Sequence, residues 1–72
     1  MIGGSKMQRL TMLRKERGLS QRALSRESGV DASTISRAEK QALMYRSQAQ
    51  NIADALGWEG DPMELFEEVE AA

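Results

Sequence analysis

The residues with the most distinctive types and spacing lie in the stretch DASTISRAEK, residues 31–40. If this stretch is helical, Ile35 and Ala38 form its apolar side, and the other side of residues 32–38 carries short groups and one long cation. The residues expected on that outward side are Ala32, Ser33, Thr34, Ser36 and Arg37. Short donors, acceptors and methyl groups can reach base edges in the major groove of duplex DNA, and arginine can bind guanine through two hydrogen bonds. A solvated helix without a ligand is the plainer alternative.

The composition removes the commonest catalytic and metal-binding groups. The 72 residues include no histidine and no cysteine, which excludes the most frequent general base, a thiolate metal site and a disulfide framework. No nucleophile–base pair is visible, so we expect no enzyme, no metal and no other cofactor. No apolar run approaches the roughly 20 residues of a membrane helix, and the first residues lack a signal-peptide layout. These features predict a cytoplasmic protein without a membrane partner.

The charge is distributed unevenly along the chain. Residues 1–57 hold all ten basic side chains against five acids, a local charge of +5, whereas residues 58–72 hold six acids and no base. Such asymmetry between the two parts of a chain is a hint of a polyanion partner on one face. Solvated helices that carry charges of both signs account for it equally well.

Apolar spacing and capping signals predict an all-α fold, a compact bundle of five short helices, and no sheet. The expected helices span 6–17, 20–28, a segment from Asp31 onward, 46–56, and a segment from Asp61 onward. Ser20, Asp31 and Asp61 are suitable N-caps, and glycines 18, 29 and 57 are suitable stops. The expected core consists of Leu10, Leu13, Leu19, Leu24, Val30, Ile35, Ile52, Ala53, Leu56 and Leu65.

The second and third predicted helices form a helix-turn-helix. They are joined by residues 29–31, Gly-Val-Asp, and a turn of about three residues that contains glycine is typical of this motif. The small side chain of Ser25 permits close approach of the two helices. We expect Val30 to fill the corner between them and Ile35 to anchor the third helix.

The stretch LRKERGLSQRALSRESGVDASTISRAEK, residues 13–40, is followed by IADALGW, residues 52–58. Together they resemble the DNA-binding domains of Cro/repressor-type regulators, the xenobiotic-response-element family. The resemblance covers roughly residues 7–58. It implies a lambda-repressor-like fold of five helices, bound as a homodimer to a double-stranded DNA operator with an inverted repeat.

The resemblance also implies roles for individual residues. Ala32, Ser33, Ser36 and Arg37 fall where members of the family read bases. The residues implied to contact phosphates are Ser20, Gln21, Lys40, Tyr45, Arg46 and Ser47, and Gln21 would also brace the third helix. Arg14 and Glu39 match an arginine and a glutamate that pair across the first and third helices.

The sequence departs from the family pattern after Glu39. The family often has a glycine two residues after this glutamate, where this chain has Gln41, and a proline-bearing loop, where this chain has residues 42–45, Ala-Leu-Met-Tyr. Either the third helix runs longer or the loop is built differently. Met44 and Tyr45 then belong to the core or to an interface.

The domain organisation places a helix-turn-helix domain at residues 6–58. Residues 1–5 are interpreted as a flexible arm or a cloning remnant, and residues 59–72 as an acidic C-terminal helix. The apolar residues of this last part either cap the core or form a homodimer seam, with Trp58, Met63, Leu65 and Phe66 as the candidates. A twofold pair would read half-sites about 34 Å apart, one turn of duplex.

Two functions remain open from the sequence. The first is a sequence-specific transcription regulator, a repressor of bacterial or phage type acting at the nucleoid, with the third helix in the major groove. The second is a protein-interaction adaptor or anti-repressor that uses the same fold and binds its partner through the C-terminal helix. DNA binding through several phosphates would weaken steeply with salt, whereas binding through apolar groups would not.

Overall fold

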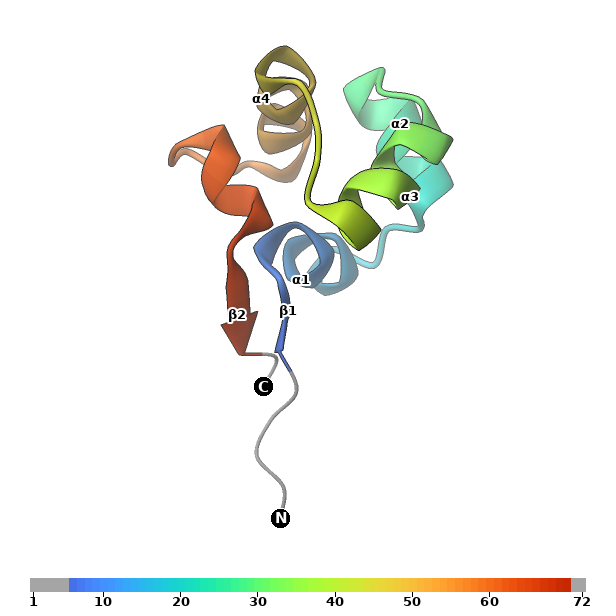
Figure 1. Cartoon of the computed structure of the whole chain (residues 1–72). Helices are drawn as coiled ribbons and strands as arrows, with labels where there is room; N and C mark the ends of the chain where they lie inside the picture. Colours follow the sequence, from blue (N-terminus) through green and yellow to red (C-terminus); the bar gives the residue numbers. More distant parts are fainter. Residues whose placement is uncertain (1–5, 71–72) are drawn as a thin grey trace.

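The computed structural model describes residues 6–70, which form four α-helices, one 3-10 helix and a two-stranded antiparallel sheet (Figure 1). In chain order the elements are β1 (Lys6–Gln8), α1 (Arg9–Glu16), α2 (Gln21–Ser28), α3 (Ala32–Gln41), α4 (Arg46–Leu56), the 3-10 helix η1 (Pro62–Phe66) and β2 (Glu68–Glu70). The arm expected at residues 1–5 lies outside the described residues, as do residues 71–72. The predominantly helical fold is confirmed, with four α-helices instead of five.

Both ends of α2 and the start of α3 form where the sequence predicts them. The Ser20 hydroxyl accepts a hydrogen bond from the amide of Ala23 at 3.0 Å, and the Asp31 carboxylate accepts one from the amide of Ser33 at 3.1 Å. Each bond satisfies one of the free amides at a helix start. Gly29 ends α2 in the left-handed conformation, with φ of 77°. Val30 is 3% exposed and fills the corner of the turn, as predicted.

Helix α3 ends without the glycine that the family often has at the position of Gln41. The left-handed residue is Ala42, with φ of 54°, three positions after Glu39. An L-residue with a Cβ pays roughly 1–2 kcal/mol for this conformation. Helix α3 therefore runs through Gln41, and the chain tolerates the strain at its end without a glycine.

Substitution at these two left-handed positions should change stability in opposite directions. We expect Ala42→Gly to raise the free energy of unfolding by about 1 kcal/mol and Gly29→Ala to lower it by about as much, because only the glycine is free of strain there. A Cβ added at Gly29 meets nothing within 4 Å, so the effect is conformational. Urea unfolding measures both, and Ala23→Gly, within α2, is the control that should destabilise. A stabilising Gly29→Ala would contradict the assignment.

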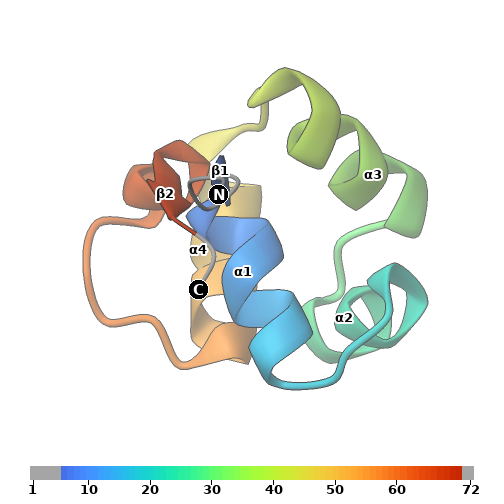
Figure 2. The ribbon, with the colours of Figure 1, turned by 90° about the horizontal axis from the view of Figure 1, so that it is seen from below.

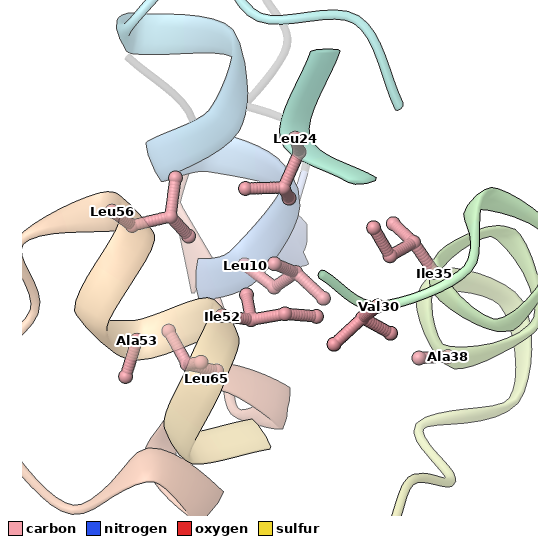
Figure 3. Packing of buried hydrophobic residues seen from close by; sticks show 9 residues of the cluster. All are labelled: Leu10, Leu24, Val30, Ile35, Ala38, Ile52, Ala53, Leu56 and Leu65. Carbon is pink, nitrogen blue, oxygen red and sulfur yellow. The ribbon is translucent and has the colours of Figure 1, made fainter. Parts of the chain in front are cut away.

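The hydrophobic core lies between α1, α2, α3, α4 and η1, with Leu10 and Ile52 near its centre (Figure 3). Eight of the ten predicted core residues are buried, and Ala38 and Ala49 join them. Leu13 and Leu19, which were also predicted, are partly buried and pack against the outside of this cluster. The described helices include none long and apolar enough to cross a membrane.

The prediction of no sheet was wrong. Strands β1 and β2 pair antiparallel, with Met7 opposite Val69 and Lys6 opposite Glu70. Opposite charges at facing positions favour such pairing. Residues 6–8, predicted as the first turn of a helix, are extended, and the first helix begins only at Arg9.

The prediction of a fifth α-helix was also wrong. Asp61 caps the segment through the amide of Met63 at 2.9 Å and Pro62 stands first, as expected, but the helix is a 3-10 turn that ends at Phe66. A longer α-helix would place Glu67, Glu68 and Glu70 at the negative end of its dipole. Instead these residues turn back toward the N-terminal strand, and the amide of Arg9 donates to the carbonyl of Glu67 at 2.8 Å.

Candidate nucleic-acid interface

Helix α3 has one buried side and one open side. Ile35 and Ala38 are 0% exposed within the core. Ser33 and Arg37, two of the predicted base-reading residues, are exposed, and Ala32 and Ser36 are partly buried. The open side therefore presents the short polar groups and the one arginine that the sequence pattern indicates. A helix is about 10–12 Å wide with its side chains, close to the width of the major groove of DNA, about 12 Å.

A bidentate ion pair fastens α3 to α1. Arg14 Nε lies 2.7 Å from Glu39 Oε2, and Arg14 Nη2 lies 3.0 Å from Glu39 Oε1. The side chains of Arg14 and Glu39 are only 12% and 9% exposed. Gln21, the first residue of α2, donates to the same Glu39 Oε1 at 3.2 Å. The Glu39 carboxylate thus links α3 to both α1 and α2 and fixes the orientation of α3 relative to them.

The hydroxyl of Ser33 is already committed as a donor. It donates to the Asp31 carboxylate, which also accepts the Ser33 amide. These hydrogen bonds hold the pKa of the Asp31 carboxyl below its ordinary value, and the bond from the Ser33 hydroxyl contributes most. The carboxylate is therefore ionised at neutral pH, and the oxygen of the exposed Ser33 hydroxyl can still accept a hydrogen bond. Arg37, one turn further along the helix, can only donate.

Two hollows flank α3. The first, of about 630 Å³, has Gln21, Ser36 and Lys40 in its wall. The second, of about 340 Å³, is lined by Thr34, Arg37, Leu43, Met44, Tyr45 and Gln48. The structure thus gathers predicted base-reading and phosphate-contacting residues at both edges of the helix.

The remaining predicted phosphate contacts differ in their surroundings. Lys40 and Ser47 are exposed, and Tyr45 is 79% exposed, so Tyr45 is not a core residue. Met44 packs partly against the core. Arg46 lies 3.4 Å from Asp61, with both side chains largely exposed, and such a contact contributes little to stability. Ser20 is exposed as well, although its hydroxyl serves the helix cap.

The acidic C-terminal segment lies across the molecule from α2 and α3. In Figures 1 and 2 the orange and red segment is on the opposite side of α1 from the helix-turn-helix. Glu68 lines the first hollow beside α3, and the other acidic side chains of this segment lie outside the lining of both hollows.

The residues predicted as a dimer seam mostly contact their own chain. Leu65 is 0% exposed in the core, and Trp58 and Phe66 pack against it. The indole of Trp58 donates to the carbonyl of Asp61 at 3.1 Å and lies under the guanidinium of Arg9, 4.8 Å from its ring centre. Met63, at 37% exposure, is the accessible member of the set.

Three further residues near α3 were not found from the sequence. Gln8 donates to the carbonyl of Ala38 at 3.0 Å, and its buried Oε1 meets no hydrogen-bond partner among the described residues. Lys6 and Lys15 line the first hollow. Gln8 and Lys6 belong to β1, and their position depends on a strand that the sequence did not predict.

The residues described give no set of three or more His, Cys, Asp or Glu side chains that could hold a metal ion.

A protein-family model described as a helix-turn-helix domain matches residues 8–66. A search of curated proteins gives no match. A search of solved structures also gives none.

Proposed function

The chain belongs to the helix-turn-helix domain family, and on this premise we propose that it is a sequence-specific DNA-binding transcription regulator, a repressor that inserts α3 into the major groove of its operator. The observation that carries the proposal is the open side of α3. Ser33 and Arg37 are exposed there, while Ile35 and Ala38 are held in the core. The bound Asp31 and Glu39 carboxylates fix the two ends of the helix.

The open side has an acceptor end and a donor end. The Ser33 oxygen would accept from an exocyclic amine, that of cytosine or adenine, and Arg37 would donate to the O6 and N7 of guanine. Four residues of helix span about 6 Å, close to the rise of two base pairs. We therefore expect the half-site to place an amine-bearing base and a guanine about two steps apart.

Backbone contacts would fix the orientation of α3. Gln21 and Lys40 line the first hollow beside α3, and Tyr45 lines the second. The other residues proposed for these contacts are their neighbours in sequence, Ser20, Arg46 and Ser47. Phosphate contacts of this kind position a protein on duplex DNA without reading its sequence. The first turn of α2 adds free amides that favour an anion.

We propose that two copies bind together, since a single recognition helix offers a small interface. Their recognition helices would reach half-sites about 34 Å apart on one face of the duplex. Met63 is the exposed member of the candidate seam. Sedimentation of the protein with and without a duplex that carries two half-sites would measure the stoichiometry.

Arg37→Ala is expected to lower affinity for the operator by about 1–3 kcal/mol and to relax the preference at one base pair, because a bidentate contact to guanine is lost. Fluorescence anisotropy with the wild-type operator and with single-base variants measures both effects. Arg17→Ala is the control, since Arg17 contacts the carbonyl of Leu56 on the α4 side. Equal operator titrations for Arg37→Ala and wild type would refute the base-reading role.

Selection of bound sequences from a pool of random duplexes tests the proposed function as a whole. We expect one enriched motif with two inverted half-sites, and binding that weakens steeply between low and high salt. No enriched motif, together with salt-insensitive binding to a protein partner, would instead support the adaptor function.

A further inference from the structure

The hollow on the α1 side of α3 brings together three lysines from three elements. Lys6 of β1, Lys15 of α1 and Lys40 of α3 all line it, and all three are exposed. None of them forms a salt bridge with a carboxylate of residues 6–70. Their charges are available to an external anion.

Two acidic residues line the same hollow, and they compensate this charge only in part. Glu39 is occupied by Arg14, at 2.7 and 3.0 Å, so the pair is neutral. Glu68 stands opposite Gln8 in the β1–β2 sheet. Three lysines against Glu68, and against Glu70, which faces Lys6 across the sheet, still leave one excess positive charge.

The hollow is continuous with the proposed DNA interface. Its other wall holds Gln21, Ser36 and Lys40, which we propose as contacts to DNA. Helix α1 and strand β1 therefore border the path that the sugar–phosphate strand would take beside α3. Figure 2 shows α1 between the C-terminal segment and the helix-turn-helix.

We propose that Lys6 and Lys15 bind phosphates of the same DNA strand that Gln21 and Lys40 contact. This extends the footprint from the helix-turn-helix over α1 and β1, and it rests on the proposed function. It also gives the small sheet a role, because pairing with β2 fixes the position of the strand that carries Lys6.

The salt dependence of binding tests this proposal. With a duplex selected by the wild-type protein, we expect Lys6→Gln and Lys15→Gln each to reduce the slope of log K against log salt concentration by about 0.9, one phosphate contact each. The double variant should lose about twice as much. The enriched sequence motif should stay the same for all variants, because phosphate contacts carry no sequence information.

Arg17→Gln is the matched control, since it removes one positive charge two residues after Lys15, with its guanidinium on the α4 side. Circular dichroism checks that each variant is folded. If both lysine variants gave the same slope as Arg17→Gln, this proposal would be overturned and the proposed function would still stand. A changed sequence motif in the lysine variants would have the same consequence. A wild-type protein that retains no duplex would overturn both.

Discussion

Replacement of Glu39 by alanine is expected to lower the free energy of unfolding by about 3 kcal/mol, because it leaves the largely buried guanidinium of Arg14 without its carboxylate. Glu39 accepts hydrogen bonds from Arg14 Nε, Arg14 Nη2 and Gln21 Nε2 at 2.7, 3.0 and 3.2 Å. A domain of this size has on the order of 4–10 kcal/mol of stability in total. The loss is therefore a large share, and urea unfolding at constant pH should show it.

The Arg9–Glu67 pair offers the comparison for Glu39→Ala. Both pairs join an arginine of α1 to a glutamate distant in sequence, but the Glu67 side chain is 61% exposed and its oxygen lies 3.3 Å from Arg9. Glu67→Ala should cost less than about 1 kcal/mol, as exposed pairs do. A double variant, Arg14→Met/Glu39→Leu, should recover part of the loss because no buried charge remains unpaired. Equal losses for Glu39→Ala and Glu67→Ala would contradict a burial-dependent effect.

The Glu39→Ala variant should also bind its operator more weakly. Without the carboxylate, Gln21 loses its partner in α3 and Arg14 loses its hold on the same helix. The open side of α3 would then no longer be fixed relative to the start of α2. Fluorescence anisotropy, measured without urea at a temperature where the variant is still folded, separates the weaker binding from unfolding.

Leu65→Ala is expected to destabilise the isolated chain by about 3 kcal/mol, within the range of 2–5 kcal/mol measured for such buried truncations. Leu65 is 0% exposed and lies in the cluster with Leu56 and Ile52 (Figure 3). The loss should not depend on protein concentration, because the side chain packs within its own chain. Urea unfolding over a tenfold or greater range of concentration measures this.

Met63→Ala is the control for Leu65→Ala, two positions away on the same segment. Its side chain is partly exposed, so the truncation should cost well under 1 kcal/mol in the isolated chain. If instead Leu65→Ala left the unfolding midpoint unchanged and only weakened self-association, the seam interpretation of Leu65 would hold and its place in the core would be wrong.

The helix-turn-helix could be predicted from the sequence because its signals are local. Ser20 and Asp31 cap the helices that follow them, and Gly29 ends α2 in the left-handed conformation. Each of these residues acts within a few positions of itself. The apolar spacing of α4 is similarly local, and that helix has the predicted bounds.

The sheet could not be predicted because its strands are short and distant in sequence. Each has three residues, too few for a recognisable alternation, and Met7 pairs with Val69 across nearly the whole chain. The end of α3 stayed open between a longer helix and a different loop, for a different reason. Ala42 takes a left-handed conformation that alanine disfavours, so its residue type gives no stop signal.

The candidate site also has parts that could be predicted from the sequence and parts that could not. The positions on α3 follow from helical spacing, and the Arg14–Glu39 pairing came from the resemblance to a family. Lys6 and Lys15 became visible only when β1 and α1 were placed beside α3. For Leu65, an apolar residue in an amphipathic pattern does not reveal whether it packs in its own core or against a second chain.

The most direct test of the proposed use of α3 is amide chemical-shift mapping of the protein on titration with the duplex that it selects. We predict that the largest changes fall at Ser33, Ser36 and Arg37 and at the first turn of α2, with small changes along η1. Largest changes within residues 58–70, with the amides of α3 unaffected, would contradict the insertion of this helix into DNA.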